Sequence, residues 1–293
     1  MGLSRLQAVF CTPLKHCYLF ILLTFCLVAK AQEWQPAGGR SQGMGNASAT
    51  FSDVWATMNN QAGLAFLEKV QVGVYSESAF GLKDLSRGTI AFAAPGKAGC
   101  LGLGISYFGG PAFSRQLVGL AFAKKFAKDF SGGIRLNYLK TNMGEYGSKG
   151  NIMMEAGIMY MPSKNFRIGF HAFNPNRVYF SNKLDQRLPG IVKLGLAWQV
   201  SDKVNWCFEA ANDIGKKPQF RTGIEYKLDE KLAFRIGFSS QPILSSFGCT
   251  YRYRNMTIDV AASYHFVLGF IPRLGIGFDI NNRVRKRKTE ETK

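Results

Sequence analysis

Residues 220–239 read FRTGIEYKLDEKLAFRIGFS, two alternating segments joined by a short charged turn. Apart from Thr222, every second side chain from 220 to 228 and from 232 to 238 is apolar, and the positions between them include Arg221, Glu225 and Arg235. Successive side chains of a strand point to opposite faces, so a period of two predicts strands with one apolar and one polar side. The stretch therefore predicts an antiparallel hairpin with one apolar face.

The same alternation recurs along the chain in fourteen segments, with tight turns after the even-numbered ones and mostly longer connections after the odd-numbered ones. In water these faces would expose a very large apolar surface. Outer-membrane barrels have an even strand number, an apolar outer face and short periplasmic turns. We therefore expect an all-β fold, a transmembrane antiparallel β-barrel of about 14 strands over residues 69–280, with both termini in the periplasm. The expected strands are 70–78, 89–94, 100–108, 115–126, 131–141, 151–161, 166–173, 191–200, 205–211, 220–228, 232–239, 246–253, 256–265 and 273–280.

The two ends of the chain carry targeting and charge signals. An apolar run from Tyr18 to Ala29 follows Arg5 and Lys15 and precedes Ala31, which predicts a signal peptide over residues 1–31. An N-terminal anchor helix is the alternative. The formal charge is +18, and residues 281–293 form a basic tail that we expect in the periplasm. Without a nucleic-acid fold signature, export to a Gram-negative outer membrane with lipid as neighbour is the expectation, and no nucleic acid is expected as a partner.

Residues 32–68 differ in composition from the barrel. Their first half is rich in Gly, Ser and Gln, and Ser52 or Asp53 can cap a short helix that runs to about Asn59. Eight glycines fall on the polar side of the expected strands. Glycine weakens the interior of a strand, so its repeated use on one side indicates that another segment approaches that side closely. Strong curvature of a narrow barrel is the other explanation. We expect a hatch or plug segment inside the lumen. The inward glycines are Gly133, Gly169, Gly195, Gly223, Gly237, Gly248, Gly275 and Gly277.

Charges of both signs share the inward side of the expected strands. Charged groups at membrane depth must be paired or wetted, so we expect cross-strand ion pairs in the lumen. The scattered cysteines and histidines give no metal-ligand spacing and no recognisable catalytic triad, and we expect no enzyme, no metal and no cofactor. The expected lumen charges are Arg135, Glu155, Arg167, Lys193, Glu209, Arg221, Glu225, Arg235, Arg252, Asp259, Arg273 and Asp279.

Three short motifs precede the first expected strand: Gly43–Ser48, Asp53-Val54-Trp55-Ala56 and Asn60-Gln61-Ala62-Gly63-Leu64. Together they resemble the start of FadL-type outer-membrane proteins. The last motif is similar to the Asn-Pro-Ala-Gly-Leu-like motif of this superfamily, with Gln61 where proline is usual. The resemblance implies that these five residues end a small hatch inside a fourteen-stranded barrel. The chain is shorter than typical fatty-acid transporters of this superfamily, whose external loops are longer. Its length therefore favours the PorV/PorQ-like group, which is associated with type IX secretion.

Two functions are compatible with these features. The first is passive transport of a small hydrophobic molecule, with Gly109-Gly110-Pro111 as a candidate lateral opening or simply the start of a loop. Its candidate apolar ligand contacts are Leu139, Met153 and Met159, which interrupt a polar lumen. The second is a PorV/PorQ-like accessory or docking component of type IX secretion that binds secretion-system or surface proteins through loop residues 177–180. The sequence names neither a ligand nor a partner.

Overall fold

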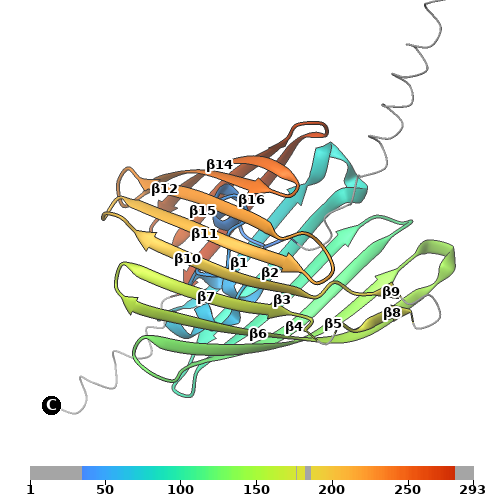
Figure 1. Cartoon of the computed structure of the whole chain (residues 1–293), viewed down its shortest axis with the longest axis horizontal. Helices are drawn as coiled ribbons and strands as arrows, with labels where there is room; N and C mark the ends of the chain where they lie inside the picture. Colours follow the sequence, from blue (N-terminus) through green and yellow to red (C-terminus); the bar gives the residue numbers. More distant parts are fainter. Residues whose placement is uncertain (1–34, 176, 182–185, 281–293) are drawn as a thin grey trace, which may run out of the picture. The chain divides into compact units, whose positions relative to one another are not determined.

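The computed structural model describes residues 35–175, 177–181 and 186–280, so the expected signal peptide and basic tail lie outside the described residues. Residues 70–280 contain a closed barrel of fourteen antiparallel strands, in which each strand pairs with the next barrel strand along the chain and β1 (Val70–Ser78) closes on β16 (Gly269–Ile280). Two short strands, β8 (Tyr179–Ser181) and β9 (Gln186–Arg187), form a separate two-stranded sheet (Figure 1). The expected fold class and strand number are thus confirmed.

The strands span much of the expected ranges. They are β1 (Val70–Ser78), β2 (Ser86–Pro95), β3 (Cys100–Gly109), β4 (Ser114–Lys125), β5 (Phe130–Asn142), β6 (Ser148–Ser163), β7 (Phe166–Phe173), β8 (Tyr179–Ser181), β9 (Gln186–Arg187), β10 (Ile191–Gln199), β11 (Val204–Asp213), β12 (Gln219–Lys227), β13 (Leu232–Ser240), β14 (Ile243–Tyr253), β15 (Met256–His265) and β16 (Gly269–Ile280).

The alternation of the sequence becomes an apolar outer wall and a polar inner one. Ile236 is 55% exposed on the outside of β13, while its neighbour Arg235 is 3% exposed. The same contrast holds across the barrel on β7, where Phe170 is 41% exposed and His171 is 1% exposed. A closed sheet has no edge strand left over, so most of its backbone groups are satisfied within the wall.

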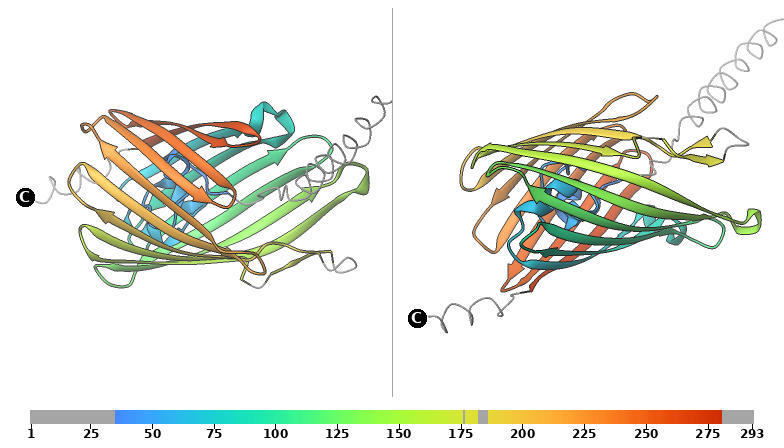
Figure 2. Two further views of the ribbon diagram at one scale, coloured as in Figure 1. Left: turned by 45° about the horizontal axis from the view of Figure 1, so that its top comes forward. Right: turned by 90° about the horizontal axis from the view of Figure 1, so that it is seen from below.

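The two ends of the barrel differ. At the turn end, where β1 begins and β16 stops, consecutive strands are joined by the tight turns that the sequence predicts. At the opposite, loop end, β6 runs beyond its neighbour β7, which it pairs with only from Glu155 onward (Figure 2). Several connections at the loop end are shorter than expected, because the strands that follow them begin earlier. These starts are Ser86 rather than 89 in β2, Ser148 rather than 151 in β6, Ile243 rather than 246 in β14 and Gly269 rather than 273 in β16. Ile243 and Leu244 are both apolar, which hides the alternation that marks a strand start.

Residues 36–67 lie inside the barrel as three short helical turns (Figure 1). These are α2 (Gly39–Gly43), η2 (Val54–Thr57) and η3 (Gln61–Phe66), and we call this segment the hatch. The side chain of Asp53 caps η2 by accepting a hydrogen bond from the Trp55 N–H at 2.9 Å. The expected helix to Asn59 is therefore a 3₁₀ turn that ends at Thr57. Three further turns lie in the loops, η4 (Ala79–Gly81), η5 (Lys83–Leu85) and η6 (Gly144–Tyr146). None of the helices among the described residues is long and apolar enough to cross a membrane.

Candidate functional site: the lumen and its hatch

The first hatch contact is centred on Glu155 of β6. Its carboxylate accepts hydrogen bonds from Asn137 Nδ2 at 2.6 Å and from Arg135 Nη1 at 3.3 Å, both on the neighbouring strand β5. His171 Nε2 of β7 lies 3.0 Å away. From the hatch, Gln61 Nε2 donates at 2.9 Å. All five side chains are buried, so this carboxylate is held by three strands and the hatch together.

A second carboxylate, Glu209 on β11, receives the hatch backbone. The N–H groups of Ser48 and Ala49 both donate to Glu209 Oε2 at 2.8 Å. On the wall side, Arg221 Nη1 of β12 donates to Oε1 at 2.8 Å. Lys193 Nζ of β10 lies 3.4 Å from Ser48 Oγ. Two backbone donors and one guanidinium satisfy the charge, which offsets the cost of its burial.

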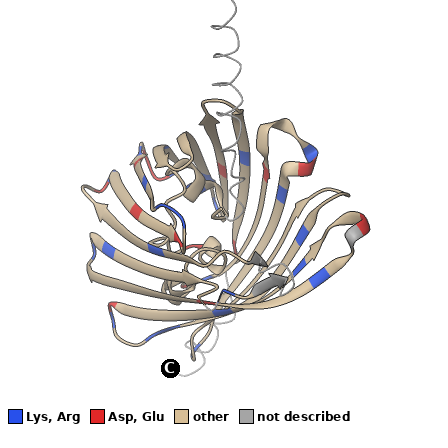
Figure 3. Ribbon diagram, turned by 45° about the vertical axis from the view of Figure 1, so that its right-hand side comes forward, with Lys and Arg blue, Asp and Glu red and all other residues tan. Residues whose placement is uncertain are grey.

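A third carboxylate, Glu225 on β12, pairs with the first helical turn of the hatch. Arg40 of α2 makes a two-point contact, with Nη2 at 2.8 Å and Nε at 3.1 Å from the two carboxylate oxygens. Arg235 Nε of β13 donates to the same carboxylate at 2.6 Å, and Arg235 Nη1 reaches Asp259 of β15 at 3.0 Å. The hatch is thus bound to three separate acidic residues of the wall. Figure 3 marks acidic and basic positions on strands on both sides of the barrel.

A fourth group lies toward the loop end and includes residues that the sequence analysis did not identify. Glu77 of β1 forms an ion pair with Arg87 Nε of β2 at 3.0 Å, and it accepts hydrogen bonds from Arg273 Nε of β16 at 3.1 Å and from the Tyr75 hydroxyl at 2.7 Å. Arg87 Nη2 also donates to the Pro36 carbonyl at 2.8 Å. Tyr75 and Glu77 are inward by the period of two on the expected first strand, which is the signal that would have found them.

The expected lumen charges all lie on the inner side of the wall, and most are in these groups. Arg167 of β7 and Arg252 of β14 are half-buried. Arg252 lines a cavity of 250 Å³ between the hatch and strands β1 and β13–β16, beside Arg40 and Asp53. Asp279 borders the same cavity and accepts from Gln71 at 2.8 Å. Charged side chains of both signs line this cavity beside a few apolar ones, so it does not suit a hydrophobic ligand. No group of three or more His, Cys, Asp and Glu in the described part could hold a metal ion.

The inward glycines explain how a backbone segment fits so close to the wall. A Cβ atom on Gly223 would lie 2.6 Å from the Cα of Met44, and one on Gly133 would lie 2.6 Å from the carbonyl carbon of Gln61. A side chain at either position would collide with the hatch backbone. Of the eight inward glycines, Gly277 is next to wall atoms only, whereas the other seven face hatch atoms.

The motif from Asn60 to Leu64 forms the start of η3, and each polar side chain in it has a wall contact. Asn60 caps the turn through the Ala62 N–H at 3.2 Å and donates to the Ile158 carbonyl of β6 at 3.3 Å. The Ala62 carbonyl accepts from Ser131 Oγ of β5 at 2.9 Å. Gln61, which replaces the usual proline, supplies the bond to Glu155 that a proline has no side-chain donor to make.

The candidate lateral opening at Gly109-Gly110-Pro111 forms the connection between β3 and β4. The Gly110 N–H donates to the Phe113 carbonyl at 2.9 Å, which closes a tight turn. β3 is paired without interruption to β2 up to Phe108 and to β4 up to Gly109. In this structure these residues are a loop-end turn beside a fully paired wall.

The ladder is instead incomplete on another side of the barrel. The β6–β7 ladder begins at Glu155 and Phe173, with one further backbone bond from the Asn174 N–H to the Met154 carbonyl at 3.0 Å. Among the described strands, residues 148–153 of β6 pair with β5 alone. The inward side chains of Leu139, Met153 and Phe173 are buried around this part of the wall. Met159, the third expected contact, lies farther toward the turn end, with its sulfur 3.7 Å from Ser52 Oγ of the hatch. The structure therefore separates Met159 from the other two.

Comparisons with known proteins support the fold. No family model and no curated protein matches the chain. Among solved structures, the CymD monoaromatic hydrocarbon channel has a TM-score of 0.63 at 13% identity, over 84% of this chain and 98% of that chain. The Ralstonia pickettii toluene transporter TbuX has 0.64 at 13% identity, over 86% and 100%. A Pseudomonas aeruginosa FadL homologue has 0.61 at 15% identity, over 84% and 98%. The chain therefore has the barrel fold of these FadL-type proteins.

Proposed function

We propose that this chain is a FadL-type outer-membrane barrel for passive transport of a small hydrophobic molecule. The apolar outer wall suits a lipid bilayer, and the short turns support an orientation with the turn end in the periplasm and the loop end outside the cell. The fold is shared with channels described as acting on monoaromatic hydrocarbons and toluene.

The observation that carries this proposal is a group of three buried apolar side chains, Leu139, Met153 and Phe173, beside the incomplete ladder. Leu139 and Met153 lie on neighbouring strands β5 and β6, and Phe173 pairs with Glu155 where the β6–β7 ladder begins. A hydrophobic molecule needs apolar contacts with a few polar groups beside them. Leu139, Met153 and Phe173 would supply the apolar contacts, and the inward Asn137 and Asn151 lie next to them in the ladder. The loop-end half of β6 is where a ligand can pass between lumen and lipid without breaking a complete ladder.

The hatch closes the route toward the periplasm. Its contacts with Glu155, Glu209 and Glu225 lie on three different strands around the lumen. A molecule that continues along the barrel axis must displace this segment, which ties transport to movement of the hatch.

Uptake by cells tests the proposal. Cells that lack their own hydrocarbon and fatty-acid transporters are given the chain, and uptake of toluene and of oleic acid is measured. We expect faster uptake of at least one probe, and we expect Met153→Arg to abolish the gain because it places a charge among these apolar contacts. Lys140→Arg, on the outer side of β5, is the matched control and keeps the gain. Equal uptake with and without the chain, for both probes, contradicts transport of these classes.

A docking barrel is the second candidate, as in the PorV/PorQ-like expectation. It is favoured by the packed hatch–wall interface and by the complete ladder beside Gly109. The two functions differ in a deletion strain. Loss of surface-protein secretion with unchanged uptake supports docking, whereas lost uptake with normal secretion supports transport.

A further inference from the structure

The connection between β15 and β16 is an exposed and wholly apolar turn. It consists of Phe266, Val267 and Leu268, which are 82%, 78% and 52% exposed. Loop tips that face water are usually polar, because a turn leaves backbone N–H and C=O groups that water must satisfy. The apolar side chains of this tip favour an apolar environment, and there its backbone groups need hydrogen-bond partners other than water.

The side chain of His265 supplies that partner. Its Nδ1 accepts hydrogen bonds from the N–H groups of Val267 and Leu268, both at 3.2 Å. The ring of Phe80 from the β1–β2 connection packs edge-on against the imidazole, with centroids 6.2 Å apart. The turn thus satisfies two of its backbone donors internally, which removes much of the cost of taking it out of water.

The tip also continues the apolar outer wall. Tyr264 and Phe270, the outward residues that flank it, have rings 4.9 Å apart and are 40% and 62% exposed. Ile243, at the start of the adjacent strand β14, is 64% exposed. No polar outward side chain on β15 or β16 separates this group from the outer-wall residues Val260 and Leu274 below it.

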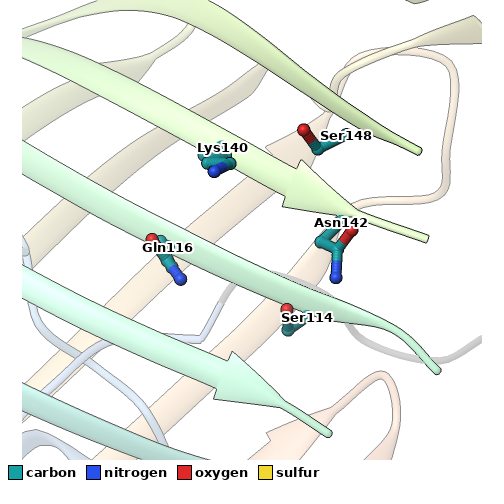
Figure 4. A pocket seen from close by; sticks show the side chains of 5 residues that line it. All are labelled: Ser114, Gln116, Lys140, Asn142 and Ser148. Atoms are coloured by element: carbon teal, nitrogen blue, oxygen red, sulfur yellow. The ribbon is translucent and has the colours of Figure 1, made fainter. Parts of the chain in front are cut away.

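The opposite side of the barrel shows the contrast. Above Tyr138, the outward side of β4, β5 and β6 becomes polar and forms a hollow of 190 Å³ lined by Ser114, Gln116, Lys140, Asn142 and Ser148 (Figure 4). Lys140 lies ten residues after Phe130, the first residue of β5, and Phe266 lies ten residues after Met256, the first residue of β15. At this distance from the turn end, the outer side of β4–β6 suits water or headgroups, whereas the outer side at β15–β16 suits acyl chains.

We propose that the Phe266–Leu268 turn inserts into the acyl chains of the outer leaflet, so that the barrel rim dips below the membrane surface at β15–β16 and stands above it at β4–β6. The inference rests on the membrane location in the proposed function. The occupant is lipid, because the tip is continuous with the lipid-facing wall and carries no charge that would select a protein partner.

Photocrosslinking in cells that export the full chain tests this. The photoreactive residue p-benzoylphenylalanine replaces Phe266, and in separate variants Phe170 of the outer wall or Ser148 of the polar hollow. Irradiation is followed by mass analysis of the chain. We expect lipid adducts at 266 and 170 in comparable yield, and none at 148.

Two other outcomes distinguish failure of this inference from failure of the membrane location. Lipid at 170 with a protein adduct, or no adduct, at 266 overturns the inference and leaves the membrane barrel intact. Absence of lipid at both 170 and 266 overturns the membrane location itself. The backbone contact is tested with His265→Ala, which should lower the lipid adduct at 266 severalfold, and with His265→Asn, whose side-chain oxygen restores an acceptor and should recover it. An equal yield in all three backgrounds contradicts the role of His265, and migration of the unheated barrel on gels verifies that each variant is folded.

Discussion

Gln61 of the hatch donates its Nε2 hydrogen to Glu155 of the wall at 2.9 Å, and both side chains are fully buried. This bond joins the hatch to a carboxylate that β5, β6 and β7 share. The bond gives Gln61, which stands where proline is usual in the motif, a structural role. A substitution at Gln61 therefore tests directly how firmly the hatch is bound to the wall.

Gln61→Ala should destabilise the docked hatch by about 1.5–3 kcal/mol, the range for a hydrogen bond to a charged group. In planar bilayers we expect more frequent open events, with deletion of residues 45–66 giving the upper limit of conductance. Gln116→Ala, on the outer side of β4, is the control with the same residue type and should leave conductance unchanged. Identical traces for Gln61→Ala and the parent chain would refute this role.

Arg40→Ala breaks the two-point contact with Glu225. We expect a loss of about 3 kcal/mol in the free energy of unfolding, at the low end for a broken buried pair because Arg235 still neutralises the carboxylate. A double-mutant cycle with Glu225→Gln measures the coupling directly in urea titrations. Additive effects of the two substitutions would show that the pair contributes nothing beyond its separate residues.

Gly223→Ala should displace the hatch, because the new Cβ would lie 2.6 Å from the Cα of Met44. Overpacking of this kind costs about 1–3 kcal/mol. Gly277→Ala is the matched control on the inner wall, since its nearest atoms are 3.9 Å away. Protease sensitivity of the hatch should rise in the first variant only, and equal sensitivity in both would mean that close approach at Gly223 is not limiting.

Ile236→Arg and Phe170→Arg place a charge on the outer wall. Each should cost roughly 2–4 kcal/mol if the site lies near the bilayer midplane and much less near the rim. Equilibrium refolding into lipid vesicles measures the difference. A cost near zero at both positions would contradict a lipid-facing wall.

Much of the barrel follows from the sequence because a period of two fixes which side each residue takes. Arg221, Glu225 and Arg235 are inward for that reason alone, and adjacent pairs such as Arg135 with Glu155 follow once the strand register is set by short turns. The strand starts at Ile243 and Gly269 do not follow, because apolar residues there break the alternation.

The hatch contacts could not be predicted in detail. Arg40 lies in a segment without periodicity, and its pairing with Glu225 depends on the path of the whole hatch across the lumen. The bond from His265 to its own turn is equally invisible, since a histidine at a strand end has many possible partners. Local pattern determines the wall, whereas the contents of the lumen depend on contacts between residues far apart in the chain.

The pairing of Arg40 with Glu225 spans 185 residues of sequence, and this separation constrains the order of assembly. The hatch is made first but finds its carboxylates on strands made much later. Contacts of such long range form slowly, since the loop entropy must be lost before they stabilise anything. Until β12 is in place, Arg40 remains in water, and the wall glutamates stay hydrated until the hatch arrives. Closure of β1 on β16 then traps the segment inside, so the barrel assembles around its own first residues.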